Sequence, residues 1–520
     1  MNTKILQSIA GFFLLGIMIA CSSDPMDELM VEESTSKELN LMTKQQIDQV
    51  ILESLRTKGD FLWMEQSVEL IYSALVLSDS TLTIGYKPAS LDNANSRLGV
   101  DDLSDPAWVN ASEQIKSTVL DVMIAQKSPR LRTNEELFQV NEFLPYIEVK
   151  VDALEVLKRL KNMGELRYME PLSYQFNYEL LNTVQEDARI VSSKGCSNDP
   201  EVNLPASDFS VISPNAKSSW NYPYMGINNA WSLSTGSGIT VGVIDTGLSP
   251  SQPMMNNSFN SGASSGRTVE KFGTYQTGSW WWKRYDGPDD QCGHGTAMAG
   301  VIASPRNSVG NAVGVAYNSN LISVRGTEDV VIDSGNEKDG VSEALVLLGN
   351  RSDVRIISMS IGDVFSNSKV ADAIRFAHNR GKLIFAAAGT STSWTNWFGV
   401  IFPANMAETV AVTGIKEAAF YQRCDTCHSG SMVDFTVIME RGGTNNHPLT
   451  TANYSNDPAM VGGSSVATAT AAGIAALVWA RNPNWNRTQV LQRMASTAHL
   501  FPNRNSQFGW GLLNAAAAVQ

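Results

Sequence analysis

The chain has 520 residues, of which 43% are hydrophobic and 18% are charged, and its formal net charge is −13. This composition is typical of a globular protein, and the length predicts two or three modules. The acidic balance argues against nucleic acid as a partner, because binding to phosphates needs a basic face.

The first 20 residues are typical of a bacterial export signal. Lys4 precedes an apolar run over residues 9–19, which is too short to span a membrane. The run ends in Met18-Ile-Ala-Cys21, which resembles the lipobox of bacterial lipoproteins. We therefore expect export to the cell envelope, with a lipid on Cys21 anchoring the chain to the membrane, at the outer membrane or the cell surface. Ordinary secretion after cleavage near Ala20 is the alternative.

An acidic tether over 21–36 leads into a region, 37–184, that carries no catalytic motif. Leucine and isoleucine at spacings of three and four predict helix over about 37–77. We expect a ferredoxin-like part over about 115–171, in a β-α-β-α-β order. Its elements are a strand at Val119–Ile124, a helix at Asn134–Phe143, a strand at Tyr146–Val151, a helix at Ala153–Leu160 and a strand at Leu166–Pro171. The polar stretch 185–215 is the predicted linker.

Three short motifs follow in the order Asp, His, Ser. Asp245 ends an apolar run, typical of a buried parallel strand, and His294 stands between two glycines before a segment of small residues. Ser465 follows Gly462-Gly463 and opens an alanine-rich helix that we expect to reach about Trp479. A serine hydroxyl needs an imidazole to accept its proton and a carboxylate to hold that imidazole, and these motifs supply the three groups.

The motifs V-I-D-T-G, G-H-G-T-A-M-A-G and G-G-S-S-V-A resemble those of the subtilisin-like serine peptidases, and the similarity extends over 216–520. The resemblance implies an α/β fold with a parallel sheet flanked by helices, and an endopeptidase acting on protein or peptide substrates. It implies that Ser465 is the nucleophile, rather than the adjacent Ser464, that His294 is the general acid/base and that Asp245 orients His294. It implies no required cofactor and no metal among the site residues. Calcium stays undecided.

The region before the linker resembles the inhibitory propeptides of the same family, with Tyr168-Met-Glu-Pro171 as its last strand. The resemblance implies that this smaller α+β domain packs against the enzyme and assists its folding, so that the chain's own propeptide is a partner. We expect cleavage between about Pro171 and Cys196. An unrelated α+β domain is the alternative.

The oxyanion hole departs from the family pattern. Where the family places an asparagine after A-A-G, this chain has Thr390. We expect the Thr390 hydroxyl and the backbone N–H of Ser465 to stabilise the oxyanion, and a slower or differently tuned enzyme, because one lost donor costs about 3 kcal/mol. Asn396 is a weaker candidate donor.

The resemblance also places a substrate pocket. Its walls are implied to be Ser360, Ile361 and Gly362, which pair with the substrate backbone, and the Ala388–Gly389 segment. Ile401 is implied to lie near the floor, where a bulky side chain narrows the pocket.

Four cysteines besides Cys21 leave alternatives open. Export favours disulfides, with Cys292 bridged to Cys196, Cys424 or Cys427. The segment Cys424-Asp-Thr-Cys427-His428 also matches the C-x-x-C-H pattern of haem attachment, and with Cys292 it could form a zinc site.

Two rival functions remain open beside the peptidase. The first is a non-catalytic module that captures peptides on a subtilisin-like fold with an impaired oxyanion hole. The second is a peptidase limited to cleavage of its own propeptide. Reaction of Ser465 with a fluorophosphonate discriminates the first, because only a competent triad activates the serine.

Overall fold

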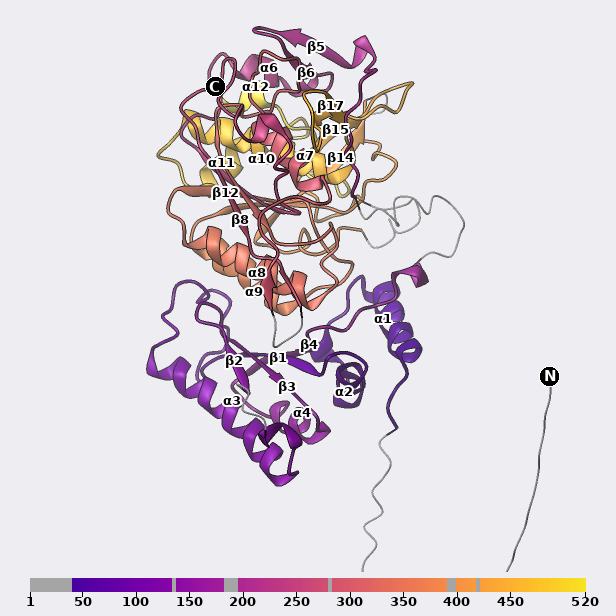
Figure 1. Ribbon diagram of the computed structural model, residues 1–520, viewed down its shortest axis with the longest axis vertical. Helices are drawn as coiled ribbons and strands as arrows, with labels where there is room; N and C mark the ends of the chain where they lie inside the picture. The colour runs from indigo at the N-terminus through magenta and orange to yellow at the C-terminus, as the bar shows by residue number, and fades with distance from the viewer. Residues whose placement is uncertain (1–39, 133–136, 182–194, 279–282, 391–398, 418–420) are drawn as a thin grey trace, which may run out of the picture. The chain divides into compact units, whose positions relative to one another are not determined.

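The structure is a computed structural model that describes residues 40–132, 137–181, 195–278, 283–390, 399–417 and 421–520 (Figure 1). Residues Leu41–Gln520 form one compact unit. The export signal, Cys21 and the acidic tether lie outside the described residues, as do residues 185–194 of the predicted linker and Asn396.

The N-terminal region forms a four-stranded antiparallel sheet in the order β2-β3-β1-β4. The sequence of elements from β1 onward is β-α-β-β-α-β, which is the ferredoxin-like arrangement. The elements of this region are α1 (Lys44–Lys58), α2 (Val68–Val76), β1 (Thr81–Tyr86), α3 (Pro106–Ala125), β2 (Phe138–Val140), β3 (Tyr146–Lys150), α4 (Leu154–Leu160) and β4 (Leu166–Pro171).

Sequence patterns located this sheet only in part. The predictions of β3, α4 and β4 are confirmed, and the helical prediction over 37–77 is met by α1 and α2. The strand predicted at Val119–Ile124 is wrong, because these residues belong to α3. The buried residues of α3 recur every three or four positions from Trp108 to Met123, so the helical period over the whole segment outweighs the local β-branched run.

The helix predicted at Asn134–Phe143 is also wrong. Residues Phe138–Val140 form β2, which pairs with β3 along the edge of the sheet, and residues 133–136 lie outside the described residues. Pairing with β3 supplies partners for the backbone that a segment this short cannot find in a helix. The ferredoxin-like part therefore begins at β1, well before the expected start near residue 115.

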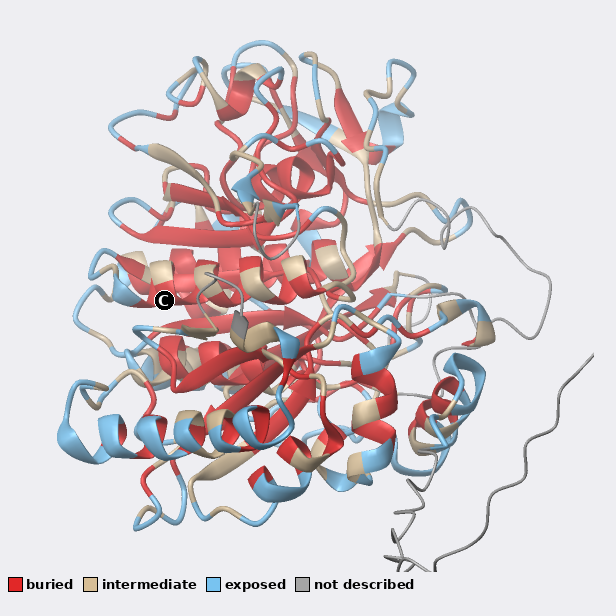
Figure 2. Ribbon diagram, turned by 60° about the horizontal axis from the view of Figure 1, so that its bottom comes forward, coloured by how far each residue is buried: buried red, intermediate tan, exposed pale blue. Residues whose placement is uncertain are grey.

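The larger part of the chain is built on a seven-stranded parallel sheet in the order β15-β14-β13-β12-β7-β11-β8. Its helices flank the sheet, and its strands are largely buried except for the edge strand β8, whose residues are half-buried (Figure 2). The expected parallel α/β fold is confirmed. The strands are β7 (Thr240–Asp245), β8 (Val269–Gly273), β11 (Asn320–Arg325), β12 (Val354–Met359), β13 (Leu383–Ala387), β14 (Thr409–Lys416) and β15 (Phe435–Glu440).

The helices of this part are α6 (Ile227–Ala230), α7 (His294–Ala303), α8 (Gly335–Asn350), α9 (Ser368–Asn379), α10 (Gly463–Arg481), α11 (Arg487–Thr497) and α12 (Ala515–Ala518). Three short hairpins complete it: β5 (Phe209–Ile212) with β6 (Ala216–Ser219), β9 (Gln276–Thr277) with β10 (Arg284–Tyr285), and β16 (Leu449–Thr451) with β17 (Pro458–Met460). Among the described residues only α10 is long and apolar enough to cross a membrane, and 89% of that apolar window is buried in the protein. It is the core helix, packed against α7 and against β12 to β15.

The N-terminal sheet makes buried polar contacts with α8 and α9. Arg167 of β4 donates two hydrogen bonds to the carboxylate of Asp372, at 2.6 and 2.7 Å. Lys369 forms ion pairs with Glu148 of β3 and with Asp339 of α8. Because ion pairs that are out of water are costly to break by removing one partner, these contacts tie the small sheet to the large one.

Candidate active site

Asp245 is the last residue of β7, and its position follows from the buried run before it. Every residue of β7 is buried, and the strand pairs in parallel with β11 and β12. The carboxylate atom Oδ1 accepts a hydrogen bond from the backbone N–H of Thr246 at 2.8 Å and lies 2.7 Å from Nδ1 of His294. Among the described residues, Oδ2 has no hydrogen-bond partner.

His294 is the first residue of α7, after an N-cap glycine. Gly293 has φ +90°, a conformation that a residue with a Cβ adopts only at a cost, so the glycine lets the chain turn into the helix. Burial alone lowers the pKa of His294, but the charge of Asp245 and its hydrogen bond outweigh burial and raise that pKa. The imidazole is thus buried, held at Nδ1 and poised to become an imidazolium.

Sequence reasoning missed Asp290, which holds the loop before His294. Its buried carboxylate accepts five hydrogen bonds, from the N–H groups of Cys292, Gly293 and Thr296 and the hydroxyls of Thr246 and Thr296. A carboxylate at the first turn of a helix is favoured by the helix dipole, and its charge also contributes to raising the pKa of His294. The signal that could have revealed it is an acidic residue just before a helix whose N-cap glycine has no side chain.

Ser465 lies in the first turn of α10, whose N-cap is Gly462, so neither Ser464 nor Ser465 is the cap. The Ser465 hydroxyl donates to the carbonyl of Ser360 at 3.4 Å, and the Ser360 hydroxyl donates to the carbonyl of Ser465 at 2.9 Å. Among the described residues, no hydrogen bond joins the Ser465 hydroxyl to His294.

The pairing of β7 with β12 brings the three groups to one edge of the sheet. Ile244 pairs with Met359, so the next residues, Asp245 and Ser360, follow at adjacent positions on neighbouring parallel strands. Asp245 binds His294 and Ser360 binds Ser465. Since neighbouring strands lie about 4.8 Å apart, the register places the residue that binds His294 next to the residue that binds Ser465.

Thr390 follows β13 at the same edge and contacts the start of α10. Its hydroxyl oxygen accepts the N–H of Ser464 at 3.0 Å and lies 2.6 Å from the Ser464 hydroxyl. The N–H of Gly389 donates to the Ser464 hydroxyl oxygen at 3.3 Å. When Ser464 donates its own proton to Thr390, the Thr390 proton stays available for another acceptor.

The expected pocket residues also come together. The N–H of Ile401 donates to the carbonyl of Ala388 at 3.0 Å, and a Cβ built on Gly362 would lie 3.4 Å from Cδ1 of Ile401. Gly362, however, is already paired: its N–H donates to Val330 and its carbonyl accepts the N–H of Ile332, both at 3.0 Å. A substrate strand can pair with Gly362 only after this pairing opens.

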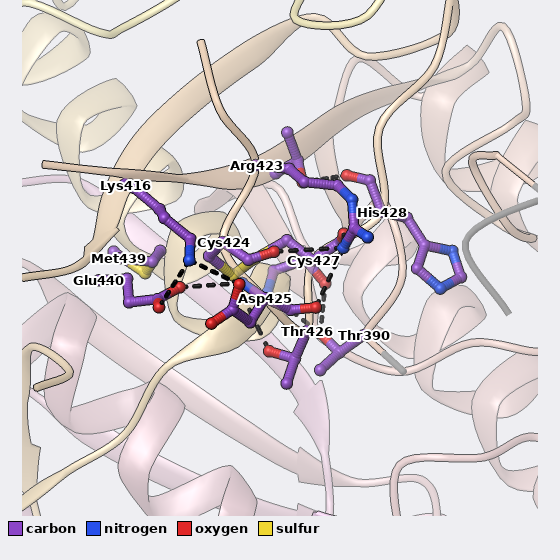
Figure 3. The surroundings of a disulfide bond; sticks show 12 residues. Thr390, Lys416, Arg423, Cys424, Asp425, Thr426, Cys427, His428, Met439 and Glu440 are labelled. Atoms are coloured by element: carbon purple, nitrogen blue, oxygen red, sulfur yellow. Dashed lines mark hydrogen bonds and ion pairs between the residues drawn. A yellow bond between two sulfur atoms is a disulfide. The ribbon is translucent and has the colours of Figure 1, made fainter. Parts of the chain in front are cut away.

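The cysteines form two disulfides, Cys196–Cys292 and Cys424–Cys427. Figure 3 shows the second of them. The Cys196–Cys292 bridge joins the segment after the predicted cleavage region to the loop before His294. It is one of the three pairings expected for Cys292. The haem and zinc interpretations are wrong for this state, because both thiols of the C-x-x-C-H segment are in a disulfide and Cys292 is bridged elsewhere. Within the described ranges no group of three or more His, Cys, Asp or Glu side chains is arranged to hold a metal ion.

Known proteins resemble this part of the chain. Residues 236–511 match the Subtilase family, Peptidase_S8. The chain is 32% identical over 286 residues to a subtilisin of Bacillus pumilus, covering 55% of this chain and 92% of that protein. It is 31% identical over 286 residues to subtilisin E of Bacillus subtilis (strain 168), covering 55% and 67%.

Among solved structures, fervidolysin from Fervidobacterium pennivorans, a keratinolytic enzyme related to subtilisin, has a TM-score of 0.55 at 16% identity. The similarity covers 85% of this chain and 61% of that chain. At this identity it shows a shared fold.

The electrostatics of His294 can be measured in the full chain carrying Ser465→Ala. We expect the imidazole to titrate above the ordinary histidine value, and Asp245→Asn to bring its pKa below that value, because burial is then opposed only by the weaker effect of Asp290. Asp290→Asn should lower it less. Histidine ring-proton NMR as a function of pH is the measurement. An unchanged titration in Asp245→Asn would contradict the assignment.

Proposed function

Because the chain belongs to the subtilase family, we propose that it is a serine endopeptidase that hydrolyses peptide bonds through an acyl-enzyme on Ser465. The observation that carries the proposal is the buried hydrogen bond from His294 Nδ1 to Asp245, at the strand end beside the carbonyl that binds Ser465. A carbonyl or carboxylate on Nδ1 fixes the tautomer that leaves Nε2 free to accept a proton.

The proposed reaction begins with rotation of the Ser465 hydroxyl from Ser360 toward His294. Oγ attacks the carbonyl carbon of the substrate while Nε2 of His294 takes the hydroxyl proton. The intermediate expels the amine, which leaves with that proton, and an ester joins the acyl group to Ser465. Water then repeats the two steps, so that the acid is released and the hydroxyl restored. Asp245 stabilises the imidazolium in both halves.

The oxyanion is stabilised by the N–H of Ser465 and by the Thr390 hydroxyl. The contacts of Thr390 with Ser464 support this role. The Ser464 N–H donates to the Thr390 oxygen, and in the arrangement where the Ser464 hydroxyl also donates to that oxygen, the Thr390 proton is left for the oxyanion. The start of α10 adds the positive end of its dipole.

The N-terminal region serves as the chain's propeptide and makes the uncut chain a zymogen. Three contacts support this role: Arg167 with Asp372, Lys369 with Glu148, and the Tyr178 hydroxyl, which donates to Asp363 at 2.7 Å. The last contact lies one residue beyond Gly362, at the proposed substrate-binding edge. The cut falls upstream of Cys196, so the mature enzyme keeps both bridges.

The chain is exported and acts on protein or peptide substrates in the cell envelope, held by a lipid on Cys21. The export signal and the lipobox-like segment support this location. A peptidase limited to its own propeptide is the second candidate, and the contact of Tyr178 with Asp363 favours it, because this contact holds the chain's own N-terminal region beside the proposed substrate-binding edge.

A fluorophosphonate probe tests catalytic competence. We expect the probe to label the native chain stoichiometrically and to leave the Ser465→Ala variant unlabelled. The Asp245→Asn variant should turn over peptides roughly 10⁴-fold more slowly, because His294 then takes the wrong tautomer. Mass spectrometry of the labelled peptide and kinetics on a peptide substrate are the measurements. Absence of labelling under native conditions would favour a peptide-binding module, and labelling without turnover of added peptides would favour self-processing alone.

Thr390 is tested by two replacements. Thr390→Val removes the hydroxyl at similar volume and should lower kcat by about 10- to 1000-fold with little change in KM. Thr390→Asn supplies an amide donor and should keep or raise kcat. Steady-state kinetics decide, and a loss in both variants would assign the threonine to packing instead.

Buried carboxyl groups at the propeptide contacts predict a pH dependence. Burial raises the pKa of Glu170 and of Asp363 to about 7, so the native chain binds protons that the unfolded chain releases. Their stabilisation is fully present below the unfolded pKa near 4 and is lost as pH rises through about 7, at up to about 1.4 kcal/mol per unit for each group.

The full chain carrying Ser465→Ala should therefore become less stable to urea between pH 5 and 7.5. Glu170→Gln should flatten this slope, while the exposed Glu179→Gln should leave it unchanged. Equal slopes in all three proteins would rule out Glu170 as the titrating group.

A further inference from the structure

The Cys424–Cys427 disulfide has no part in the proposed reaction, and its place in the chain suggests a local role. Both cysteines are fully buried, and only three positions separate them, against 96 for the other bridge. A short closed loop restrains the unfolded chain much less than a long one, so global stability is a weak reason for this bridge. Its neighbours are more informative.

The bridged loop pairs with the chain segment that follows β13. Thr390 forms an isolated antiparallel bridge with Cys427, and the N–H of His428 donates to the carbonyl of Gly389 at 3.0 Å. Gly389 and Thr390 are the residues whose position decides where the proposed oxyanion donor points. Figure 3 shows Thr390 beside the loop that the disulfide closes.

The side chain of His428 reaches a second point of the same region. Its Nδ1 lies 2.8 Å from the carbonyl of Gly399, and since a carbonyl only accepts, Nδ1 carries the proton. Burial lowers the pKa of His428 to about 4, so the ring is neutral at neutral pH. The ring also covers Gly389, where a Cβ would come within 2.4 Å of Nδ1. His428 thus contacts the described residues on both sides of 391–398.

The other side of the loop is fixed to β14. The N–H of Cys424 donates to the carbonyl of Gly414 at 3.0 Å, and Lys416 forms an ion pair with Asp425 at 2.6 Å. Arg423 donates to three loop carbonyls, those of Cys424, Asp425 and Cys427 (Figure 3). The loop therefore connects a core strand to the segment that carries Thr390.

We propose that residues Cys424–His428, the Cys424–His428 clip, position Gly389 and Thr390 for stabilisation of the oxyanion. The inference rests on the proposed peptidase function. A threonine hydroxyl is shorter than the asparagine amide of the family, so the backbone that carries it must be held in place. Oxyanion donors act because they are fixed before the charge develops, and a displacement of about 1 Å can cost about 100-fold in rate.

The first test replaces the bridge by two hydroxyls, in Cys424→Ser/Cys427→Ser. We expect kcat to fall by about 10- to 100-fold while KM changes by less than about three-fold, because the clip acts on the transition state. Val490→Ala, a buried truncation in α11, is the control for general destabilisation and should leave kcat unchanged well below its melting temperature. An unchanged kcat in the double variant would overturn the proposal.

His428 provides a second test that keeps the bridge. His428→Leu removes the donor to Gly399 and should lower kcat, whereas His428→Asn places an amide nitrogen on Cγ, as Nδ1 is, and should restore kcat to within a few-fold of the native value. Equal losses in both variants would show that bulk, and not the hydrogen bond, is what matters, and would overturn the role given to His428.

Hydrogen exchange separates failure of this inference from failure of the proposed function. In the double variant, the amide protons of Gly389 and His428 should exchange at least about 10-fold faster than in the native chain, whether or not the chain hydrolyses peptides. Faster exchange without any native turnover would refute the peptidase and keep the clip. Native turnover with unchanged exchange would refute the clip and keep the peptidase.

Discussion

Parallel pairing between β7 and β12 is the constraint on which the candidate site depends. It sets Asp245 and Ser360 at adjacent positions where the two strands end. Asp245 binds the imidazole of His294, and the carbonyl of Ser360 binds the hydroxyl of Ser465. A shift of register by one residue would turn the side chain of Asp245 to the other face of the sheet. The buried apolar residues of β7, present on both faces, fix that register by packing.

Burial disfavours the charged form of the ionisable groups both at the site and at the propeptide contacts, but the resulting pKa shifts differ in whether a neighbouring charge outweighs burial. At His294 the charge of Asp245 outweighs burial and favours the imidazolium. At Glu170 and Asp363 the effect of burial on the pKa is larger than that of the hydrogen bonds these carboxylates accept, so the protonated forms are favoured. The two parts of the chain therefore respond differently to pH: the site keeps a charge pair, while the contact between the parts holds protons that it can release.

The sequence predicted the large sheet and the motif-bearing elements well, because their signals are local. A buried run predicts β7, and the alanine-rich segment after two glycines predicts α10. The smaller sheet was harder, since Val119–Ile124 has strand-like residues within a helix and β2, at three residues, is too short to show a strand pattern.

At the site, Asp245, His294 and Ser465 could be proposed from the sequence, but the partners of Thr390 and the contacts of Asp290 could not. These depend on contacts between distant segments, such as Thr390 with Ser464, that no local pattern records. The pairing of Gly362 with Val330 was also beyond local reasoning, since it joins two segments that lie outside the strands and are distant in the sequence.

The Cys196–Cys292 bridge joins the segment just after the proposed cut to the loop that carries His294. Gly195 lies against His294 and Val330, close enough that an added Cβ would come within 3.5 Å of the imidazole and 2.8 Å of the valine. The backbone of Ser197 donates to Cys292, and Asn198 accepts from Asn453. A cut upstream of Cys196 therefore cannot free this segment, because the bridge and these hydrogen bonds hold it beside the imidazole. After the proposed cut, the new N-terminal segment would stay beside His294. A glycine suits position 195, because its φ of +80° is one that side chains rarely adopt and an added Cβ would clash with Val330.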